Sequence, residues 1–157
     1  MSKLRFGIVG TGFIAGAIAD AIARSQSCTL AAVSSRRQAT ADAFVASRPG
    51  TAGVEGWQAL VARDDVDAVY VATPTVAKEA IALGAVAAGK HILVDKPFMS
   101  AASVRRMSEA AAAAGLLFMD ATHFVHNPRT IAIKKAMADE VGKPLSLATA
   151  FYFRSTT

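Results

Sequence analysis

The chain alternates between short apolar runs and longer segments in which apolar residues recur every three or four positions. The short runs have the length of strands, whereas the recurring spacing is typical of helices that pack by one face. We predict strands over Arg5–Val9, Thr29–Ser34, Val66–Ala72, His91–Val94 and Leu116–His123. Helical patterns lie between these strands, so that the two kinds of element alternate along the chain.

Most of the predicted strands are almost continuously apolar, as over residues 68–72. Strands of this kind are buried on both faces, which is usual in a parallel sheet covered by helices. Alternation of such strands with helices indicates right-handed βαβ units. The sequence therefore predicts an α/β fold with a doubly wound parallel sheet, the Rossmann arrangement.

Two helical patterns are bounded by residues that favour helix ends. Ser100 is placed to cap one helix and Gly115 to end it, and Asn127 with Pro128 at the first turn is placed to begin another. The apolar stripes are Ile14, Ile18 and Ile22; Val104, Met107, Ala111 and Ala114; and Ile133, Met137 and Val141.

The last segment does not continue the alternation. After a break over residues 142–144, Leu145–Phe153 has the composition of a strand and no helix follows it. We expect residues 1–127 to form the Rossmann domain, and residues 128–157 to form a linker helix and the first strand of a second α+β domain that is otherwise missing. An exposed edge strand tends to pair with another chain, so we expect this segment either to form a homo-oligomer or to be disordered.

Composition excludes several partners. The chain has 157 residues, is 53% hydrophobic and carries a net charge of +5, with its basic residues scattered along the sequence. Scattered charge without interleaved aromatic residues does not favour nucleic acid. No apolar run reaches the roughly 18 residues of a membrane helix, no signal peptide is visible, and the single Cys28 forms no internal disulfide. We expect a cytoplasmic protein that binds no membrane.

A glycine-rich turn joins the first strand to the first helix. Residues 10–15 read Gly-Thr-Gly-Phe-Ile-Ala, which matches the G-x-G-x-x-G/A fingerprint of dinucleotide-binding folds in its required position. Gly10 permits the tight turn, Gly12 lets a pyrophosphate approach the main chain, and Ala15 allows close packing of the helix. The residues predicted to bind the cofactor here are Gly10, Thr11, Gly12, Phe13 and Ile14.

The end of the second strand bears on the choice of cofactor. An NAD site usually has Asp or Glu about 20 residues after the fingerprint, on the ribose hydroxyls. No carboxylate stands at this place in the sequence, which reads Ser35, Arg36, Arg37. A hydroxyl and two guanidinium groups suit the 2′-phosphate of NADP, because Arg binds phosphate with paired donors. NADP is favoured, and NAD remains the alternative.

Further motifs resemble a known family. Residues 72–74 read Ala-Thr-Pro, residues 88–91 read Ala-Gly-Lys-His, and residues 91–97 read His-Ile-Leu-Val-Asp-Lys-Pro. With these motifs the chain resembles the N-terminal, cofactor-binding half of the Gfo/Idh/MocA oxidoreductases over residues 3 to about 153. Residues 118–120 and 126–129 make it most similar to the dihydrodiol and xylose dehydrogenases of that family.

The resemblance implies roles for individual residues. Lys96 would be catalytic, beside the nicotinamide and the substrate hydroxyl, where a cation orients the reacting oxygen or assists proton transfer. Thr73, Pro74 and Asp95 would contact the cofactor, with Asp95 in place of the usual Glu. Lys78 stands where many members have His, and Val125 stands where many have Arg. The family's other catalytic residues lie in a second domain.

The leading hypothesis is the NADP-binding domain of an oxidoreductase that transfers a hydride between NADP and a hydroxyl-bearing carbon of a sugar or diol. We expect this chain to be inactive alone. The alternative is a non-catalytic dinucleotide-binding or assembly module. Short-chain dehydrogenase chemistry is disfavoured, because neither Tyr70 nor Tyr152 is followed by Lys four residues later. We expect no metal site, since no carboxylate or Cys joins His123 and His126 at ligand spacing.

Overall fold

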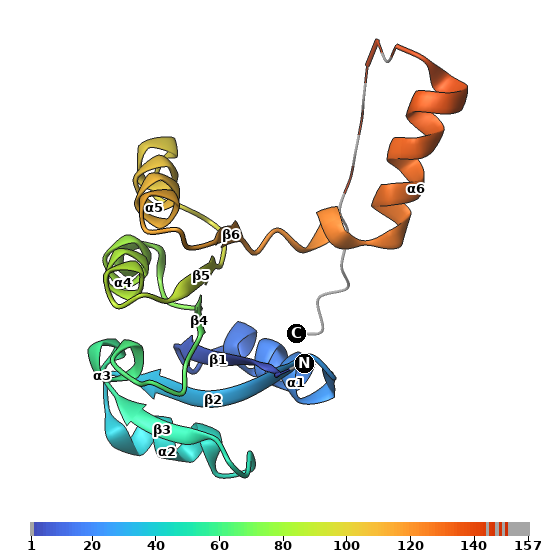
Figure 1. Cartoon of the computed structure of the whole chain (residues 1–157). Helices are drawn as coiled ribbons and strands as arrows, with labels where there is room; N and C mark the ends of the chain where they lie inside the picture. The colour runs from blue at the N-terminus through green and yellow to red at the C-terminus, as the bar shows by residue number, and fades with distance from the viewer. Residues whose placement is uncertain (1, 144, 147, 149, 151–157) are drawn as a thin grey trace. The chain divides into compact units, whose positions relative to one another are not determined.

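The computed structural model describes residues 2–143, 145–146, 148 and 150. The chain forms two compact units, Met1–Ala121 and Thr122–Thr157. The first unit holds a parallel sheet of β1 (Leu4–Val9), β2 (Cys28–Ser35), β3 (Ala52–Glu55), β4 (Ala68–Val71), β5 (His91–Val94) and β6 (Phe118–Asp120) (Figure 1). Its helices are α1 (Phe13–Arg24), α2 (Gln38–Val45), α3 (Trp57–Val61), α4 (Thr75–Ala87) and α5 (Ala101–Ala113).

The strand order confirms the doubly wound prediction. The sheet runs β3-β2-β1-β4-β5-β6, and every neighbouring pair is parallel. The chain winds outward in one direction from β1 to β3 and in the other direction from β4 to β6. The point between β1 and β4 is therefore the topological switch point, and ligands of such sheets bind outside the carboxyl ends of the strands there.

Successive residues of β1 face opposite layers of helices. Ile8 packs in a cluster with Tyr70 and the α1 residues Ala15 and Ala19, whereas Val9 belongs to the cluster that contains buried residues of α3, α4 and α5. Figure 1 shows α1 on one side of the sheet and α4 and α5 on the other. Each fully buried aliphatic side chain contributes about 1.5–3 kcal/mol, and both layers together hold the carboxyl ends of the strands in place.

Two details of the sheet differ from the sequence prediction. The strand β3 was not predicted, because its four residues, Ala-Gly-Val-Glu, include one glycine and only one β-branched residue. The predicted strand over Leu116–His123 is too long, since β6 covers only Phe118–Asp120 and His123–His126 forms a 3₁₀ helix. Among the described residues β6 pairs with β5 alone, and this pairing stops at Asp120 because β5 ends opposite at Val94.

Both predicted helix starts are confirmed. The Ser100 hydroxyl accepts a hydrogen bond from the Ser103 amide at 3.1 Å at the start of α5. In the second unit, Asn127 Oδ1 accepts from the Arg129 amide at 2.9 Å, and α6 (Pro128–Ala136) begins at Pro128. The last part of the third predicted stripe lies in a π-helical turn over Met137–Val141.

Part of the C-terminal prediction is not covered by the structure. Most of the predicted strand Leu145–Phe153 lies outside the described residues. The strand, and a homo-oligomer formed through it, therefore stay predictions. The first compact unit ends at Ala121, while the predicted division at residue 127 stays a prediction about domain organisation. Across the part of the chain that the structure describes, no helix has both the length and the apolar character needed to cross a bilayer.

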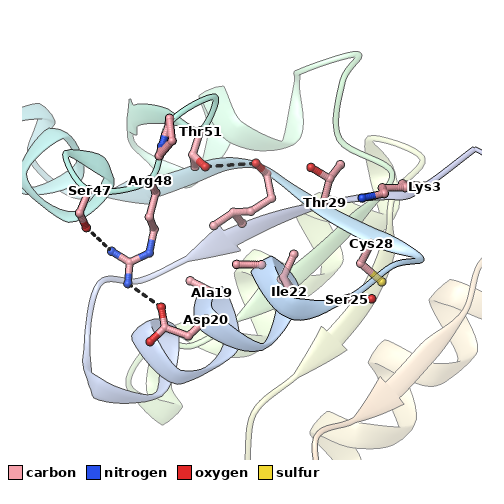
Figure 2. Close-up of a pocket in the computed structure, with 13 residues that line it drawn as sticks. Lys3, Ala19, Asp20, Ile22, Ser25, Cys28, Thr29, Ser47, Arg48 and Thr51 are labelled. Carbon is pink, nitrogen blue, oxygen red and sulfur yellow. Dashed lines mark hydrogen bonds and ion pairs between the residues drawn. The ribbon is translucent and has the colours of Figure 1, made fainter.

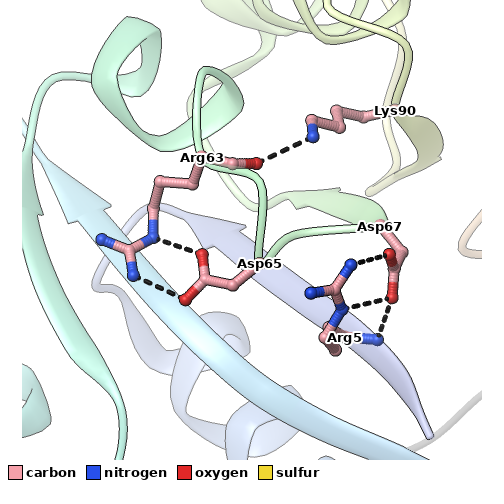
Figure 3. A network of polar contacts seen from close by, with 5 residues as sticks. All are labelled: Arg5, Arg63, Asp65, Asp67 and Lys90. Atoms are coloured by element: carbon pink, nitrogen blue, oxygen red, sulfur yellow. Dashed lines mark hydrogen bonds and ion pairs between the residues drawn. The ribbon is translucent and has the colours of Figure 1, made fainter. Parts of the chain in front are cut away.

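A network of charged side chains joins the amino ends of β1 and β4, opposite the switch point. The guanidinium of Arg5 donates to both carboxylate oxygens of Asp67, with Nε 2.9 Å from Oδ2 (Figure 3). Arg63 pairs with Asp65, and Lys90 Nζ donates to the main-chain oxygen of Arg63 at 2.8 Å. The hydrogen bond from Arg5 lowers the pKa of Asp67 to about 2.

Candidate functional site

A cleft of about 940 Å³ opens along the carboxyl ends of the strands, at the place that the strand order indicates. It is bordered by the residues that follow β1, β2, β3 and β4 and by the first turns of α3 and α4. Of the residues predicted to bind a cofactor, the cleft is lined by Gly10, Thr11, Gly12, Ser35, Arg36, Arg37, Thr73 and Pro74.

The turn after β1 has the geometry that the glycine fingerprint predicts. Gly10 has φ +118°, and a Cβ there would lie 2.5 Å from the main-chain oxygen of Ala72 on the neighbouring strand. Gly12 has φ −81°, and a Cβ there would meet nothing within 4 Å. Ala15 is fully buried. Gly10 therefore allows β1 and β4 to approach closely, while Gly12 leaves open space at the start of the helix.

The N-terminus of α1 is free to bind an anion. Gly12 caps the helix without a side chain, and the first turn contains no acidic residue. The amides at a helix start have no partner within the helix and carry the positive end of its dipole. An uncapped helix start beside a space that a Cβ would fill fits a diphosphate group. Phe13 is 88% exposed and Ile14 packs against the core, and neither of these two predicted residues lines the cleft.

The end of β2 places polar and cationic groups at one side of the cleft. Ser34 is fully buried, and its hydroxyl has no hydrogen-bond partner among the described residues. Arg36 and Arg37 are exposed, and neither forms an ion pair with any residue that the structure describes. Two guanidinium groups without an acidic partner, next to a serine, fit an anionic group such as a phosphate monoester.

A carboxylate missed by the sequence analysis lies at the same edge. Glu55, the last residue of β3, pairs in register with Ser35, the last residue of β2, and lines the cleft. No carboxylate directly follows β2 in the sequence, and Glu55 reaches this edge only through the pairing of β3 with β2 in the folded chain. Glu55 was missed because β3 was not predicted, and only the pairing of β3 with β2 brings the two strand ends together.

The carboxyl ends of β4 and β5 hold the residues predicted for the nicotinamide side. Thr73 lines the cleft, and its buried hydroxyl has no partner in the described part of the chain. Asp95 and Lys96 follow β5, the strand next to β4, but neither lines the cleft itself. Asp95 is 8% exposed, whereas Lys96 is exposed to solvent. Of these three residues, Thr73 is the one that lines the cleft.

Lys78 is buried beneath this region, in the first turn of α4. It is 3% exposed, and its Nζ donates to the main-chain oxygens of Lys96 at 2.9 Å and Pro97 at 3.0 Å. Burial lowers the pKa of Lys78, an effect that the negative charge of Asp95 opposes and the positive charge of Lys96 adds to. The peptide bond between Lys96 and Pro97 is cis. Sequence reasoning noted Lys78 only as a departure from the family pattern.

A second, smaller hollow of about 400 Å³ lies at the amino ends of β1 and β2 (Figure 2). Arg48, which lines this hollow, already has partners. Its guanidinium group binds Asp20 at 3.0 Å and lies 4.6 Å from the centre of the Phe44 ring. It contains none of the predicted site residues. Nor do the described residues contain a cluster of three or more His, Cys, Asp or Glu side chains that would hold a metal ion.

Together, the switch-point cleft, the uncapped start of α1 and the Gly10–Gly12 turn define a dinucleotide-binding Rossmann domain. Residues 4–122 match the model of the oxidoreductase family GFO_IDH_MocA, described as an NAD-binding Rossmann fold. The chain belongs to this Gfo/Idh/MocA family.

Relatives of known activity include reductases and dehydrogenases. The chain is 36% identical over 154 residues to dTDP-3,4-didehydro-2,6-dideoxy-alpha-D-glucose 3-reductase of Actinomadura kijaniata, covering 96% of this chain and 46% of that protein. Identity is 30% to D-xylose 1-dehydrogenase (NADP(+)) 2 of Haloferax volcanii and 28% to trans-1,2-dihydrobenzene-1,2-diol dehydrogenase of Macaca fascicularis. These two relatives confirm the predicted resemblance. The chain spans about half the length of the curated relatives it matches.

Solved structures share the fold. A 3-ketoreductase from Actinomadura kijaniata, in complex with NADP and TDP-benzene, superposes with a TM-score of 0.82 at 34% identity over 89% of this chain and 43% of that one. GenD2 from gentamicin A biosynthesis, in complex with NAD, gives 0.81 at 27% identity over 88% of this chain and 40% of that one. Both nicotinamide cofactors thus occur among the structural neighbours.

Proposed function

We propose that this chain is the NADP(H)-binding part of an oxidoreductase that transfers a hydride between NADP and a hydroxyl-bearing carbon of a sugar or diol. The observation that carries the proposal is the uncapped start of α1 beside the open space at Gly12. The unpaired guanidinium groups of Arg36 and Arg37 at the end of β2 support NADP over NAD. Ser34 and Thr73, whose buried hydroxyls have no partner among the described residues, line the same cleft.

The residues divide according to the part of the cofactor or substrate that they contact. Gly10, Thr11 and Gly12 bind the diphosphate through main-chain amides, and Ser35, Arg36 and Arg37 bind the 2′-phosphate. Thr73, Pro74 and Asp95 position the nicotinamide end. When bound, the reduced cofactor NADPH would donate the hydride and the oxidised cofactor NADP would accept it. Lys96 Nζ donates a hydrogen bond to the reacting oxygen and transfers a proton to it when a carbonyl is reduced.

The substrate class rests on the relatives. The proteins named above act on a deoxysugar nucleotide, on xylose and on a dihydrodiol, each of which has a hydroxyl-bearing carbon or its carbonyl counterpart. We therefore propose a sugar or diol substrate for the complete enzyme. Because the chain spans about half of these relatives, we expect it to bind cofactor without turnover on its own. A normal rate of NADP reduction with xylose or a diol would contradict that expectation.

A substitution at Gly12 tests the proposed site. Its main-chain conformation accepts a side chain, and a Cβ there meets no protein atom within 4 Å. Gly12→Val is therefore expected to fold as the parent does but to bind NADPH at least about tenfold more weakly, because the side chain enters the space of the diphosphate. Gly16→Ala, in α1 and also in open space, is the matched control.

Binding is measured by fluorescence titration of NADPH and NADH, and folding by thermal melting. We expect the folded parent chain to bind NADPH. If well-folded parent protein binds neither coenzyme, the proposed function is wrong. If Gly12→Val binds NADPH as tightly as Gly16→Ala does, the diphosphate is not at this turn.

A further inference from the structure

We propose that Glu55 sets the balance between NADP(H) and NAD(H), by holding a negative charge next to the place of the 2′-phosphate. This inference rests on the function proposed above and adds a residue that works against the cationic pair at the end of β2. It follows from where the carboxylate lies, from the main-chain group that it binds, and from its failure to pair with either arginine.

The position of Glu55 is set by the sheet. β2 and β3 are parallel, and Ser35 pairs with Glu55 at the last step of their register. Both residues line the same cleft, together with Arg36 and Arg37. β3 is held close to α2, since a Cβ on Gly53 would lie 2.5 Å from Asp42 Oδ1. The carboxylate is therefore fixed at the adenosine side of the cleft by main-chain pairing and not by chance contact.

Glu55 also occupies the start of α2. Its Oε2 accepts a hydrogen bond from the main-chain amide of Gln38, the first residue of the helix, at 2.9 Å. Arg37, at the N-cap position, offers no side-chain cap, and the first turn of α2 has no acidic residue of its own. The amide and dipole of α2, which would favour an anionic ligand, are thus already satisfied by a carboxylate of the protein.

The side chain of Gln38 keeps this arrangement in place. Its Nε2 donates to the main-chain oxygen of Gly53 at 2.9 Å and to Asp42 Oδ1 at 2.7 Å. The first residue of α2 is therefore tied to β3 through both its main chain and its side chain. Because of these contacts, Glu55 is expected to keep its position when a cofactor enters.

The charged side chains at this edge of the cleft have opposite effects on the binding of a 2′-phosphate. Glu55 forms no ion pair with Arg36 or Arg37 in the described part of the chain, so the two cations stay available for a 2′-phosphate. The doubly charged phosphate is nevertheless repelled by the nearby carboxylate, whereas the 2′-hydroxyl of NAD is not. Glu55 thereby reduces the preference for NADP(H) that the arginines create, and the site is suited to both cofactors.

Neutralising Glu55 gives a direct test. Glu55→Gln keeps an oxygen that can accept from the Gln38 amide while removing the charge. We expect it to tighten NADPH binding about 3- to 10-fold and to change NADH binding less than about twofold, the size expected for one partly screened charge. The ratio of NADPH affinity to NADH affinity is expected to differ less between Glu55→Gln and the parent at 500 mM salt than at 50 mM salt, because salt screens exposed charges.

Three further variants keep the result interpretable. Glu109→Gln removes an exposed carboxylate from α5, outside the cleft, and is expected to leave the ratio unchanged. Glu55→Asp retains the charge and is expected to keep the ratio of the parent. Glu55→Ser is a second neutral variant in case Glu55→Gln fails to fold, and it must shift the ratio in the same direction.

The outcomes separate this inference from the function on which it rests. A parent chain that binds either coenzyme, combined with an unchanged ratio in both neutral variants, would overturn the role of Glu55 and leave the proposed function standing. Equal tightening for NADPH and NADH would also overturn it, since the 2′-phosphate would then not be the group affected. A folded parent that binds neither coenzyme would overturn both proposals.

Discussion

The ammonium group of Lys78 is bound to the main chain of Lys96, the residue proposed to act on the substrate. Nζ of Lys78 donates to the Lys96 oxygen at 2.9 Å and to the Pro97 oxygen at 3.0 Å. Lys78 is 3% exposed, and a buried ammonium group is costly unless it is hydrogen-bonded. These contacts tie the first turn of α4, which follows the Thr73-Pro74 segment of the cleft, to the segment after β5.

Replacing Lys78 should therefore affect one end of the cofactor more than the other. Lys78→Met keeps the length of the side chain but removes all its donors, so the carbonyls of Lys96 and Pro97 lose their partner. We expect NADPH to bind about 3- to 10-fold more weakly, while 2′,5′-ADP, which lacks the nicotinamide half, binds as in the parent. Isothermal titration with both ligands measures the difference.

If Lys78 had only a general structural role, Lys78→Met would have a different effect. The variant would then bind both ligands more weakly, or would melt at a lower temperature without a ligand-specific effect. Lys78→Arg serves as the conservative comparison, because a guanidinium group retains donors for the two carbonyls. Equal losses for NADPH and 2′,5′-ADP in Lys78→Met would show that Lys78 does not act on the nicotinamide side.

The Arg5–Asp67 pair predicts how stability depends on pH. Arg5 lowers the pKa of Asp67 from 3.8 to about 2, so the folded state favours the ionised carboxylate. The stabilisation is fully present above pH 4 and is lost as the pH falls through 2. Asp67→Asn should be less stable than the parent at pH 6, and this difference should shrink as the pH is lowered from 4 to 2.

Chemical denaturation at fixed pH values checks the Asp67 prediction. Asp64→Asn is the matched control, since Asp64 is exposed in the same loop and forms no hydrogen bond or ion pair with Arg5. The control is expected to follow the pH dependence of the parent. A stability difference for Asp67→Asn that is constant from pH 6 to pH 2 would contradict the assignment.

Gly10 is the position in the cleft where a side chain is least tolerated. Its φ of +118° is rare for residues with a Cβ, and that Cβ would lie 2.5 Å from the Ala72 oxygen. Gly10→Ala is expected to destabilise the fold by at least about 2 kcal/mol. Gly16→Ala, in the helix interior with open space around it, should stabilise by about 0.5–1 kcal/mol. Urea denaturation of the two variants compares them, and similar stabilities would contradict the prediction.

The parts of the fold that local sequence determines were predictable. The apolar run of β4 and the apolar end of β1 indicated burial on both faces, and Ser100 and Asn127 marked helix starts through their own side chains. The glycine turn was predictable from the pattern of residues 10–15, although the close approach of Gly10 to Ala72 was not. Each of these features has a signature in residues that are close together in the sequence.

The features that were missed depend on contacts between distant segments. β3 has little strand propensity and is fixed by pairing with β2, so neither the strand nor the place of Glu55 was visible in the sequence. The burial of Lys78 results from the packing of α4 beside the segment after β5, which places its ammonium group 2.9 Å from a carbonyl 18 residues away. A basic, polar residue in a helical pattern would otherwise be expected at the surface.

Ser35 and Arg36, at the end of β2, provide the sharpest test of cofactor preference. The double variant Ser35→Asp, Arg36→Ala introduces a carboxylate that accepts hydrogen bonds from the ribose hydroxyls of NAD and removes a guanidinium group from the place of the 2′-phosphate. We expect the ratio of NADPH to NADH affinity to fall by about 5- to 150-fold, equivalent to about 1–3 kcal/mol, the scale of charge-assisted hydrogen bonds. Arg105→Ala, an exposed arginine of α5 outside the cleft, controls for the loss of positive charge and should leave the ratio unchanged. If the double variant keeps the ratio of the parent, the 2′-phosphate is not bound at the end of β2.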